Sequence, residues 1–385
     1  MSVTVPEGFA AQGVAAGLKS TGLADLAVVV NLGVNPVGAA VFTSNRAKAN
    51  PILWSEQAIR SGQVRAIVLN SGGANCFTGE FGYETSVLTA KLAAGELGVD
   101  PNQIQVCSTG LIGEGGPAFR EAILHALPGA LATAHEEGGE AAARAIMTTD
   151  TRPKMAAYRG DGWSIGGMAK GAGMLAPGLA TMLVVLTTDV GLDPIGARRA
   201  LRSATAQTFD HLDSDGCMST NDQVTLLSSG MSAAQPSEEE FTAALTEVCR
   251  DLALQLLDDA EGASHNITIR VVGAVSESDA LEVGRSVARN NLFKAAIFGN
   301  DPNWGRVLAA IGTTRAAFDP YEVDVWMNGV RVCHHGGPDQ PRDQVDLSER
   351  NTEVLIDLQT GAAEGTIWTN DLTHDYVHEN SAYSS

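Results

Sequence analysis

The most constraining feature of the sequence is a glycine-rich but apolar stretch from Gly160 to Gly178. It carries a lone lysine, Lys170, and leads into an apolar run that begins at Thr181. Glycines let backbone segments approach closely and adopt positive φ angles, and Pro177 fixes a turn just ahead of the threonine. A flexible linker would be polar, whereas this stretch is rich in Met, Ala and Gly. We therefore expect a closely packed turn and strand within one core.

The pattern along the first half predicts an α/β protein, because short β-rich runs alternate with turn residues and amphipathic helices. Strands are expected at Leu26 to Val30, Ala39 to Thr43 and Ala66 to Asn70. Helices are expected near Thr85 to Leu97 and Ala141 to Met147.

The second half begins with the strongest helix signal, Glu238 to Asp259, where Ser237 and Glu240 form a capping box. A second helix is expected from Asp279 to Phe293. The later elements form a β-rich C-terminal part: a hairpin from Val323 to Val332 that turns at Asn328-Gly329, then strands at Val354 to Leu358 and Thr366 to Thr369.

Charge excludes several classes of partner. The 385 residues include 45 acidic and 25 basic side chains, which gives a formal net charge of −20. A surface that binds nucleic acid or anionic lipid must supply cations, so we expect neither partner. The longest apolar run, Ala180 to Leu186, falls far short of the ~20 residues that span a bilayer. The first 22 residues do not resemble a signal peptide, so a cytoplasmic location is expected.

Cysteine and histidine spacing predicts neither a disulfide framework nor a metal site. The cysteines lack a Cys-x-x-Cys pair, and we interpret them as mostly buried apolar residues: Cys76, Cys107, Cys217, Cys249 and Cys333. His334 and His335 are adjacent in a glycine-rich turn, which is more typical of a solvated loop than of metal ligands. We therefore expect no metal.

The residues around Thr181 suggest two interpretations. Its hydroxyl could attack the carbonyl of Ala180, and hydrolysis after an N→O acyl shift would leave Thr181 as a new N-terminus. The freed α-amine, with a pKa near 8, could then act as base for the hydroxyl. From spacing alone, a buried loop whose threonine caps or pairs remains the favoured alternative. No phosphate-loop or dinucleotide-binding fingerprint follows the glycines.

Several long motifs occur in one order along the chain. They are Ser108-Thr-Gly-Leu-Ile-Gly113, Met147-Thr-Thr-Asp-Thr151, Lys170-Gly-Ala-Gly-Met-Leu-Ala-Pro-Gly-Leu-Ala-Thr-Met-Leu183, Asp215-Gly-Cys-Met-Ser-Thr-Asn-Asp222, Asp259-Ala-Glu-Gly262, Asp301-Pro-Asn-Trp-Gly-Arg306 and Glu379-Asn-Ser-Ala-Tyr-Ser-Ser385. With these motifs the sequence resembles the ornithine acetyltransferase family, and the resemblance extends from the N-terminus to the last residue. With this resemblance, a catalytic Thr181 becomes the favoured interpretation in place of a purely structural one.

The resemblance implies a layered α/β/β/α-type sandwich with a β-rich C-terminal part. It also implies self-cleavage between Ala180 and Thr181 into an alpha chain, 1–180, and a beta chain, 181–385, which share one core. Two alpha and two beta chains would form a heterotetramer. The implied reaction is a ping-pong transfer of acetyl from N-acetylornithine through Thr181 to glutamate. No cofactor is expected, and acetyl-CoA stays open as a second acetyl donor.

The resemblance also implies site residues. Thr109 and Gly110 match the pair that stabilises the developing negative oxygen, and Thr181 is the catalytic nucleophile. The implied substrate-binding positions are Thr148, Lys170, Thr181, Glu261, Asn380 and Ser385. Lys170 suits a substrate carboxylate, and Glu261 suits the side-chain ammonium of ornithine.

Two other classes of function stay open at this point. A self-cleaving amidohydrolase or aminopeptidase would pass the acyl group to water. A non-catalytic acidic binding or scaffold protein would use Thr181 for neither cleavage nor transfer.

Overall fold

The computed structural model describes residues 2–175 and 182–382, and it divides into two compact units. The first comprises the described residues of Met1–Ala172, Gly178–Asp210 and Met218–Leu256. The second comprises those of Gly173–Pro177, His211–Cys217 and Leu257–Ser385. The 1–180 and 181–385 chains expected from self-cleavage are a different division, and their boundary lies outside the described residues.

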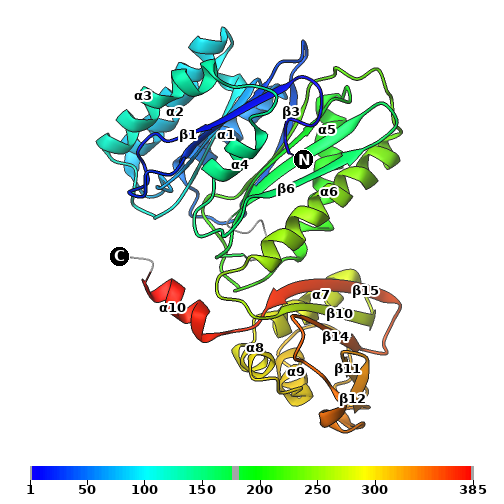
Figure 1. The fold of residues 1–385 in the computed structure, drawn as a ribbon. Coiled ribbons are helices and arrows are strands. Elements are labelled where there is room, and N and C mark those ends of the chain that lie inside the picture. The colour runs from blue at the N-terminus through cyan, green and yellow to red at the C-terminus, as the bar shows by residue number, and fades with distance from the viewer. Residues whose placement is uncertain (1, 176–181, 383–385) are drawn as a thin grey trace. The chain divides into compact units, whose positions relative to one another are not determined.

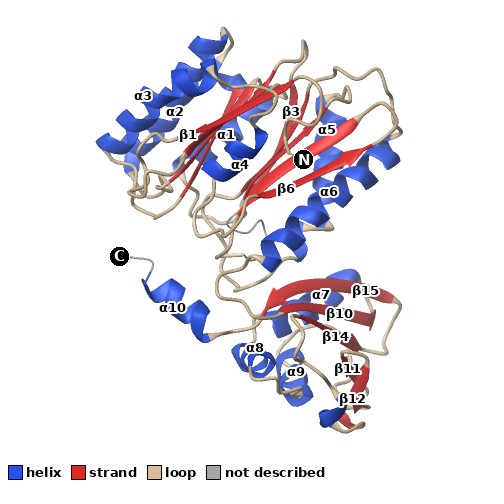
Figure 2. Cartoon of the chain, viewed as in Figure 1, coloured by secondary structure: helices blue, strands red, loops and turns tan. Residues whose placement is uncertain are grey.

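Two sheets form the centre of the first unit (Figure 2). One has the order β1-β2-β4-β5, in which β4 and β5 are parallel and the other pairs are antiparallel. The other has the order β3-β9-β8-β7-β6, in which β8 and β9 are parallel. The strands are β1 (Phe9–Val14), β2 (Leu26–Asn31), β3 (Val37–Phe42), β4 (Ala66–Ser71), β5 (Ile104–Thr109), β6 (Lys154–Arg159), β7 (Ser164–Lys170), β8 (Leu183–Thr188) and β9 (Gln223–Ser228).

Helices cover the outer faces of both sheets (Figure 1). The first sheet packs on α1 (Asn50–Ala58), α2 (Gly79–Leu97) and α3 (Pro117–Ala132). The second packs on α5 (Pro194–Ala206) and α6 (Glu238–Asp258), and α4 (Gly139–Ala145) adds apolar side chains to the core between the sheets.

Alternate side chains along the strands point into the core between the two sheets. Val29 and Ile67 of the first sheet share a cluster with Met168 and Val185 of the second. Their neighbours along the same strands, such as Val28 and Val68, instead pack against the helices. This period-2 alternation, with both faces buried, produces the apolar runs in the sequence. The expected α/β/β/α sandwich is confirmed.

Adjacent glycines in β7 allow close packing on both of its faces. A Cβ on Gly167 would lie 2.9 Å from a methyl carbon of Leu252 in α6. A Cβ on Gly166 would lie 2.2 Å from the carbonyl oxygen of Ser2. The part of the stretch that forms β7, Ser164–Lys170, is therefore a buried strand, as its composition predicts.

The second unit contains a sheet of order β13-β12-β11-β14-β10-β15. A buried cluster that includes Ile269, Val283, Phe293 and Ile311 joins this sheet to its helices. The elements are β10 (Asn266–Ala274), α7 (Glu277–Ala288), α8 (Asn291–Phe298), α9 (Trp304–Ile311), β11 (Asp324–Met327), β12 (Val330–His334), β13 (Gly337–Pro338), β14 (Asn351–Asp357), β15 (Ala363–Asn370) and α10 (His374–Ala382). The expected β-rich C-terminal part is confirmed.

Most expected elements appear, with one correction. Asn328 and Gly329 have φ angles of 44° and 83°, as the expected hairpin turn requires. The single helix expected from Asp279 to Phe293 is wrong: it breaks before Asn290, whose side chain caps α8 through the Phe293 N–H at 3.0 Å. Four of the five cysteines are buried, which confirms that most of them are, and Cys217 is exposed.

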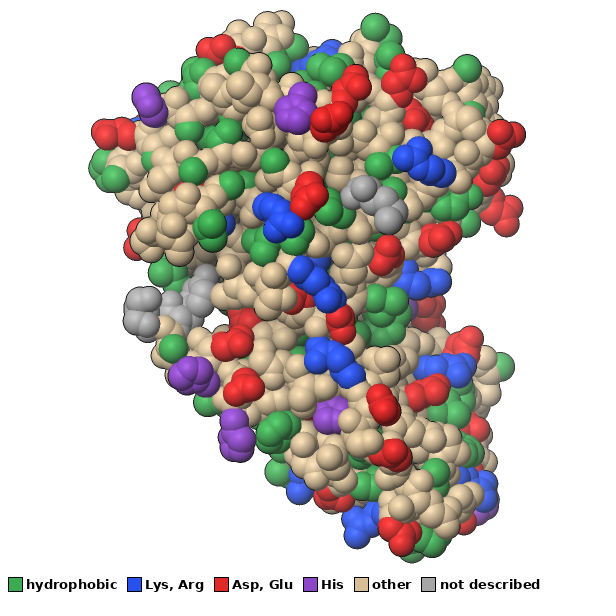
Figure 3. Space-filling model, viewed as in Figure 1, with side chains coloured by type: hydrophobic (Ala, Val, Ile, Leu, Met, Phe, Trp, Pro, Cys, Tyr) green, Lys and Arg blue, Asp and Glu red, His purple; other side chains and the backbone are tan. Residues whose placement is uncertain are grey.

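Charged side chains are interspersed over the face drawn in Figure 3, where red acidic and blue basic groups alternate with apolar ones. Within residues 2–175 and 182–382, no helix combines the length and apolar character that a membrane crossing requires.

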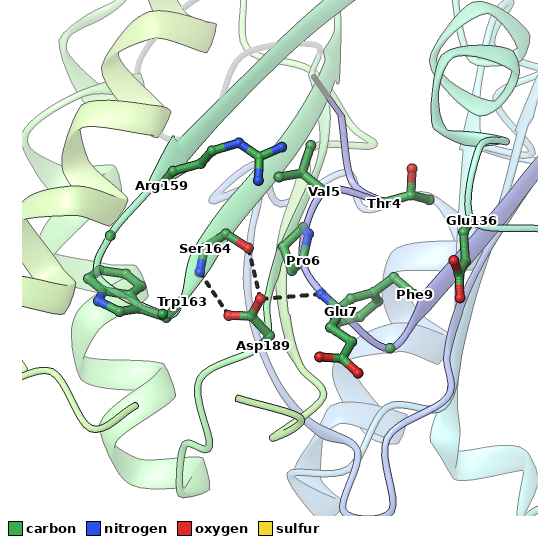
Figure 4. Close-up of a pocket in the computed structure, with 13 residues that line it drawn as sticks. Thr4, Val5, Pro6, Glu7, Phe9, Glu136, Arg159, Trp163, Ser164 and Asp189 are labelled. Carbon is green, nitrogen blue, oxygen red and sulfur yellow. Dashed lines mark hydrogen bonds between the residues drawn. The ribbon is translucent and has the colours of Figure 1, made fainter. Parts of the chain in front are cut away.

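Asp189 ties the N-terminal segment to β7 (Figure 4). Its carboxylate accepts hydrogen bonds from the N–H and hydroxyl of Ser164, both at 2.8 Å, and from the N–H of Glu7 at 3.2 Å. The carboxylate forms part of the wall of a hollow of about 400 Å³ that also includes Arg159 and Glu136. Of the site residues predicted from the sequence, those that the structure describes do not line this hollow.

Replacing Asp189 by Asn should destabilise the first unit. The new amide group would face N–H donors that now find a carboxylate oxygen, and a buried unmatched donor costs roughly 1–3 kcal/mol. Urea unfolding measures the loss. Asp161→Asn, at an exposed position in the β6–β7 hairpin, is the matched control and should change stability by less than about 0.5 kcal/mol. Equal effects of the two substitutions would contradict this role of Asp189.

Candidate active site

Lys170 and Thr109 meet at the ends of two strands from different sheets. Lys170 ends β7 and Thr109 ends β5, and their exposed fractions are 1% and 3%. The Lys170 Nζ donates a hydrogen bond to the Thr109 hydroxyl oxygen at 3.0 Å. The structure thus brings together two residues that are 61 positions apart and that the sequence assigns to one site.

Gly110 follows Thr109 in a conformation that favours glycine, with φ at +133°. A Cβ at this position would lie 2.5 Å from the backbone nitrogen of Gly73, because the two turns are closely packed. The Gly73 N–H donates to the Thr109 carbonyl at 3.0 Å. The glycine is therefore required sterically, whatever its N–H does in catalysis.

Asn221 reinforces this contact from a third segment. Its side-chain amide donates to the carbonyl of Ser108 at 2.8 Å and to the carbonyl of Ala74 at 2.7 Å. Sequence reasoning gave this residue no individual role. The available signal was a run of polar residues between Asp215 and Asp222 that lacks the spacing of a calcium loop.

The Asp150 carboxylate accepts hydrogen bonds from backbone N–H groups and from a lysine ammonium close to Lys170. It accepts from the Thr148 N–H at 2.9 Å, from the Gly171 N–H at 2.7 Å and from the Lys154 ammonium at 2.5 Å. Burial alone would raise the pKa of Asp150, but Lys170, Lys154 and the Gly171 N–H outweigh it and hold that pKa below its usual value. The carboxylate therefore stays charged at neutral pH, and Thr148 is held beside it.

Glu261 and Asn380 meet within the second unit. The Asn380 side-chain amide donates to Glu261 Oε2 at 3.0 Å. A Cβ on Gly173 would lie 2.4 Å from the same oxygen, so glycine leaves room for the carboxylate there. Glu261 also lines a pocket of about 190 Å³, together with Ser214, Asp215, Arg289, Asn291, Lys294, Asn370, Asp371, Leu372 and Tyr376.

Two ionisable groups at or beside this pocket received no individual role from the sequence. Lys294 is buried and donates to the Ser214 carbonyl; burial lowers its pKa to about 8, against the opposing effect of Asp215 and Asp213. Burial raises the pKa of Asp213 to about 6, although Arg289 at 2.8 Å opposes the shift. No motif identified either residue, since each gains its environment only through tertiary packing.

The remaining predicted residues, Ala180, Thr181 and Ser385, lie outside the described residues. The residue that follows Thr181 is placed: the Met182 N–H donates to Asp222 Oδ1 at 3.1 Å. Burial raises the pKa of Asp222 well above its usual value.

The fold and this site define an α/β/β/α protein in which a buried lysine and threonine meet beside a sterically required glycine. The sequence matches the family model described as "ArgJ family" over residues 10–385. It is 58% identical to the arginine biosynthesis bifunctional protein ArgJ of Streptomyces avermitilis over the full length of both chains. The Mycobacterium tuberculosis H37Rv relative of the same name is 49% identical, and the match covers 100% of this chain and 96% of that one.

Among solved structures, the ornithine acetyltransferase of Mycobacterium tuberculosis complexed with ornithine matches 47% of this chain and 96% of its own, at 44% identity and a TM-score of 0.45. The family and curated matches cover nearly the whole sequence. The chain therefore belongs to the ArgJ family, and it is an acetyltransferase enzyme of arginine biosynthesis. The alternative of a non-catalytic scaffold protein is excluded.

Asp150→Asn should destabilise the protein by roughly 3–5 kcal/mol in urea unfolding, because it removes the carboxylate from a fully buried ion pair with Lys154. The exposed pair Arg144–Glu140 has the same i,i+4 spacing. Glu140→Gln is therefore the matched control, with an expected loss of at most about 0.5 kcal/mol. Similar losses in both variants would contradict the importance of the buried pair.

Gly110→Ala should cost roughly 2–4 kcal/mol, from backbone strain and the collision with Gly73. Gly113 also has a positive φ, 91°, but a Cβ there meets nothing within 4 Å. Gly113→Ala should therefore cost only about 1–2 kcal/mol, the strain alone. Urea unfolding of the two variants compares the losses, and a Gly113 variant as unstable as the Gly110 variant would disprove the steric explanation.

Proposed function

We propose that the chain is a glutamate N-acetyltransferase, which moves acetyl from N2-acetyl-L-ornithine to L-glutamate by a ping-pong mechanism. The observation that carries the proposal is the buried contact of Lys170 with Thr109, next to Gly110, at the strand ends of the two sheets. A binding protein has no need to bury a cation against a hydroxyl beside a turn of positive φ. The relatives' names supply the pathway.

Self-cleavage before Thr181 would generate the nucleophile. Its hydroxyl would attack the Ala180 carbonyl, and water would hydrolyse the resulting ester, leaving a carboxylate on Ala180 and an α-amine on Thr181. Chain connectivity supports this assignment, because Thr181 is bonded to Met182, whose N–H is held by buried Asp222.

The first half-reaction would acetylate the Thr181 hydroxyl. As the Oγ–carbon bond forms, the α-amine takes the hydroxyl proton, and the ornithine amine leaves with a proton as its bond to the acetyl carbon breaks. Between these two events, in the tetrahedral intermediate, the acetyl oxygen carries negative charge, which donors from Thr109 and Gly110 would stabilise until the carbonyl re-forms and the amine leaves. Losing one such donor typically raises the barrier by about 2.7–4 kcal/mol. Glutamate reverses the sequence and accepts the acetyl group.

The charged side chains would orient the substrates. Lys170 would bind a substrate carboxylate. Thr148 would contribute close to Lys170, because both residues interact with Asp150. Glu261, whose carboxylate contacts Asn380, would bind the ornithine ammonium, and Ser385 would complete the binding site from the terminal segment. We propose acetyl-CoA as a second acetyl donor, since the curated relatives are named bifunctional, and a heterotetramer of two alpha and two beta chains as the assembly.

Thr181→Ala should remain one uncut chain and lose acetyl transfer by at least about 10³-fold, because it lacks the nucleophile. Intact mass, N-terminal sequencing and transfer of labelled acetyl from N-acetylornithine to glutamate measure both effects. Thr181→Ser keeps a hydroxyl and is the matched control, which should still be cut.

Each result bears on a separate part of the proposal. A wild-type chain that is uncut yet active would refute the cleavage step. A cut chain that releases labelled acetate and no N-acetylglutamate would identify the enzyme as a hydrolase. Acetyl-CoA replaces N-acetylornithine in a parallel assay, and absence of transfer there would refute the second donor.

A further inference from the structure

Two histidines and two carboxylates meet at the edge of the second unit's sheet. Asp324 begins β11 and His334 ends β12, so the antiparallel register Val325↔Cys333 places them opposite each other. His334 Nδ1 lies 2.9 and 3.0 Å from the two oxygens of Asp324. Asp324 is buried, with 5% exposed.

The next turn adds the other two groups. His335 has a φ of 43°, and Gly336, also at positive φ, donates its N–H to the Val323 carbonyl at 3.0 Å. The turn therefore folds back on the start of β11. His335 Nδ1 consequently lies 2.5 Å from Glu322 Oε2, and the two imidazole rings lie with their centroids 3.9 Å apart and their planes tilted by 51°.

We propose that Glu322, Asp324, His334 and His335 form a binding site for a divalent transition metal of the zinc type. Ligand atoms of Asp324, His334 and His335 all lie within 4.8 Å of one another. Tetrahedral zinc with bonds of about 2.0–2.1 Å separates its ligands by about 3.3 Å, so a small contraction closes the site. The exposed side chains of His335 and Glu322 can make that movement.

The donor set and charge favour zinc over magnesium or calcium. Imidazole suits zinc, copper and nickel, whereas magnesium and calcium prefer oxygen ligands alone. Two carboxylates neutralise a divalent ion. An imidazole that carries its proton on Nε2 offers its Nδ1 lone pair to the metal.

Neighbouring groups are compatible with the site. Arg331 lies 3.6 Å from Asp324 Oδ2, but its closer partner is Asp339, at 2.7 Å. The Cys333 thiol donates instead to the Val323 carbonyl, so it is left out of the proposed ligand set. The metal would link the start of β11 to the turn after β12, so its binding would stabilise this hairpin.

Zinc titration of the untagged, metal-free protein tests the site by calorimetry and by competition with a chromogenic chelator. We expect one zinc per chain at this site, a higher melting temperature and slower amide exchange in residues 323–336. His335→Asn keeps a residue that tolerates positive φ, and His334→Gln keeps a hydrogen-bonding group. Each should weaken zinc binding at least about tenfold without lowering the zinc-free melting temperature.

The matched control uses the other closely spaced histidines. His374 and His378 are spaced i,i+4 on α10, so they are the pair against which the hairpin site is compared. His378→Asn should leave the zinc affinity of the hairpin site and its protection from exchange unchanged. Loss of zinc binding in His378→Asn but not in His335→Asn would overturn the proposal, as would zinc binding that protects no amide of the hairpin.

Discussion

The buried carboxylate of Asp150 is the constraint on which the contact between Lys170 and Thr109 depends. Lys154 and Lys170 place two ammonium groups where their side chains are almost inaccessible to water, and such charges are tolerated only with compensating partners. Asp150 supplies negative charge, and the N–H groups of Thr148 and Gly171 fix its position. Because Thr148 precedes Asp150 and Gly171 follows β7, this carboxylate joins the segment after α4 to the end of the glycine-rich strand. Lys170 is thereby aimed at Thr109.

Close backbone approach is the second constraint, and it explains the composition of the most unusual stretch. Gly166 and Gly167 leave space on opposite faces of β7, one toward the N-terminal segment and one toward α6. Gly110 does the same for the turn after β5. Side chains at these positions would collide with the segments packed against them. The glycines therefore serve packing first, and any role of their N–H groups in catalysis builds on that.

The sequence predicted periodic and local features well and tertiary ones poorly. Buried strands such as Leu26–Asn31 and the Asn328-Gly329 turn are encoded in adjacent residues, so their existence could be predicted. The helix expected across Asn290 failed because apolar periodicity continued through a residue that caps a new helix. Thr109, Lys170, Glu261 and Asn380 were identified through motifs, and their pairwise contacts appear in the structure. Asn221 and Lys294 were missed, since their partners come from distant segments.

The sequence also showed no sign of the ionisable groups whose pKa values shift toward neutrality, because those shifts arise from tertiary packing. The raised pKa of Asp213, about 6, means that its contribution to folding becomes less favourable as pH rises through that value. The lowered pKa of Lys294, about 8, means that its contribution becomes less favourable as pH falls through that value. Between about pH 6 and 8 both groups are charged and buried, so the fold bears both desolvation costs. Apolar residues would avoid those costs, and retained buried charge beside a pocket that contains Glu261 favours a role in binding charged substrates over one in stability.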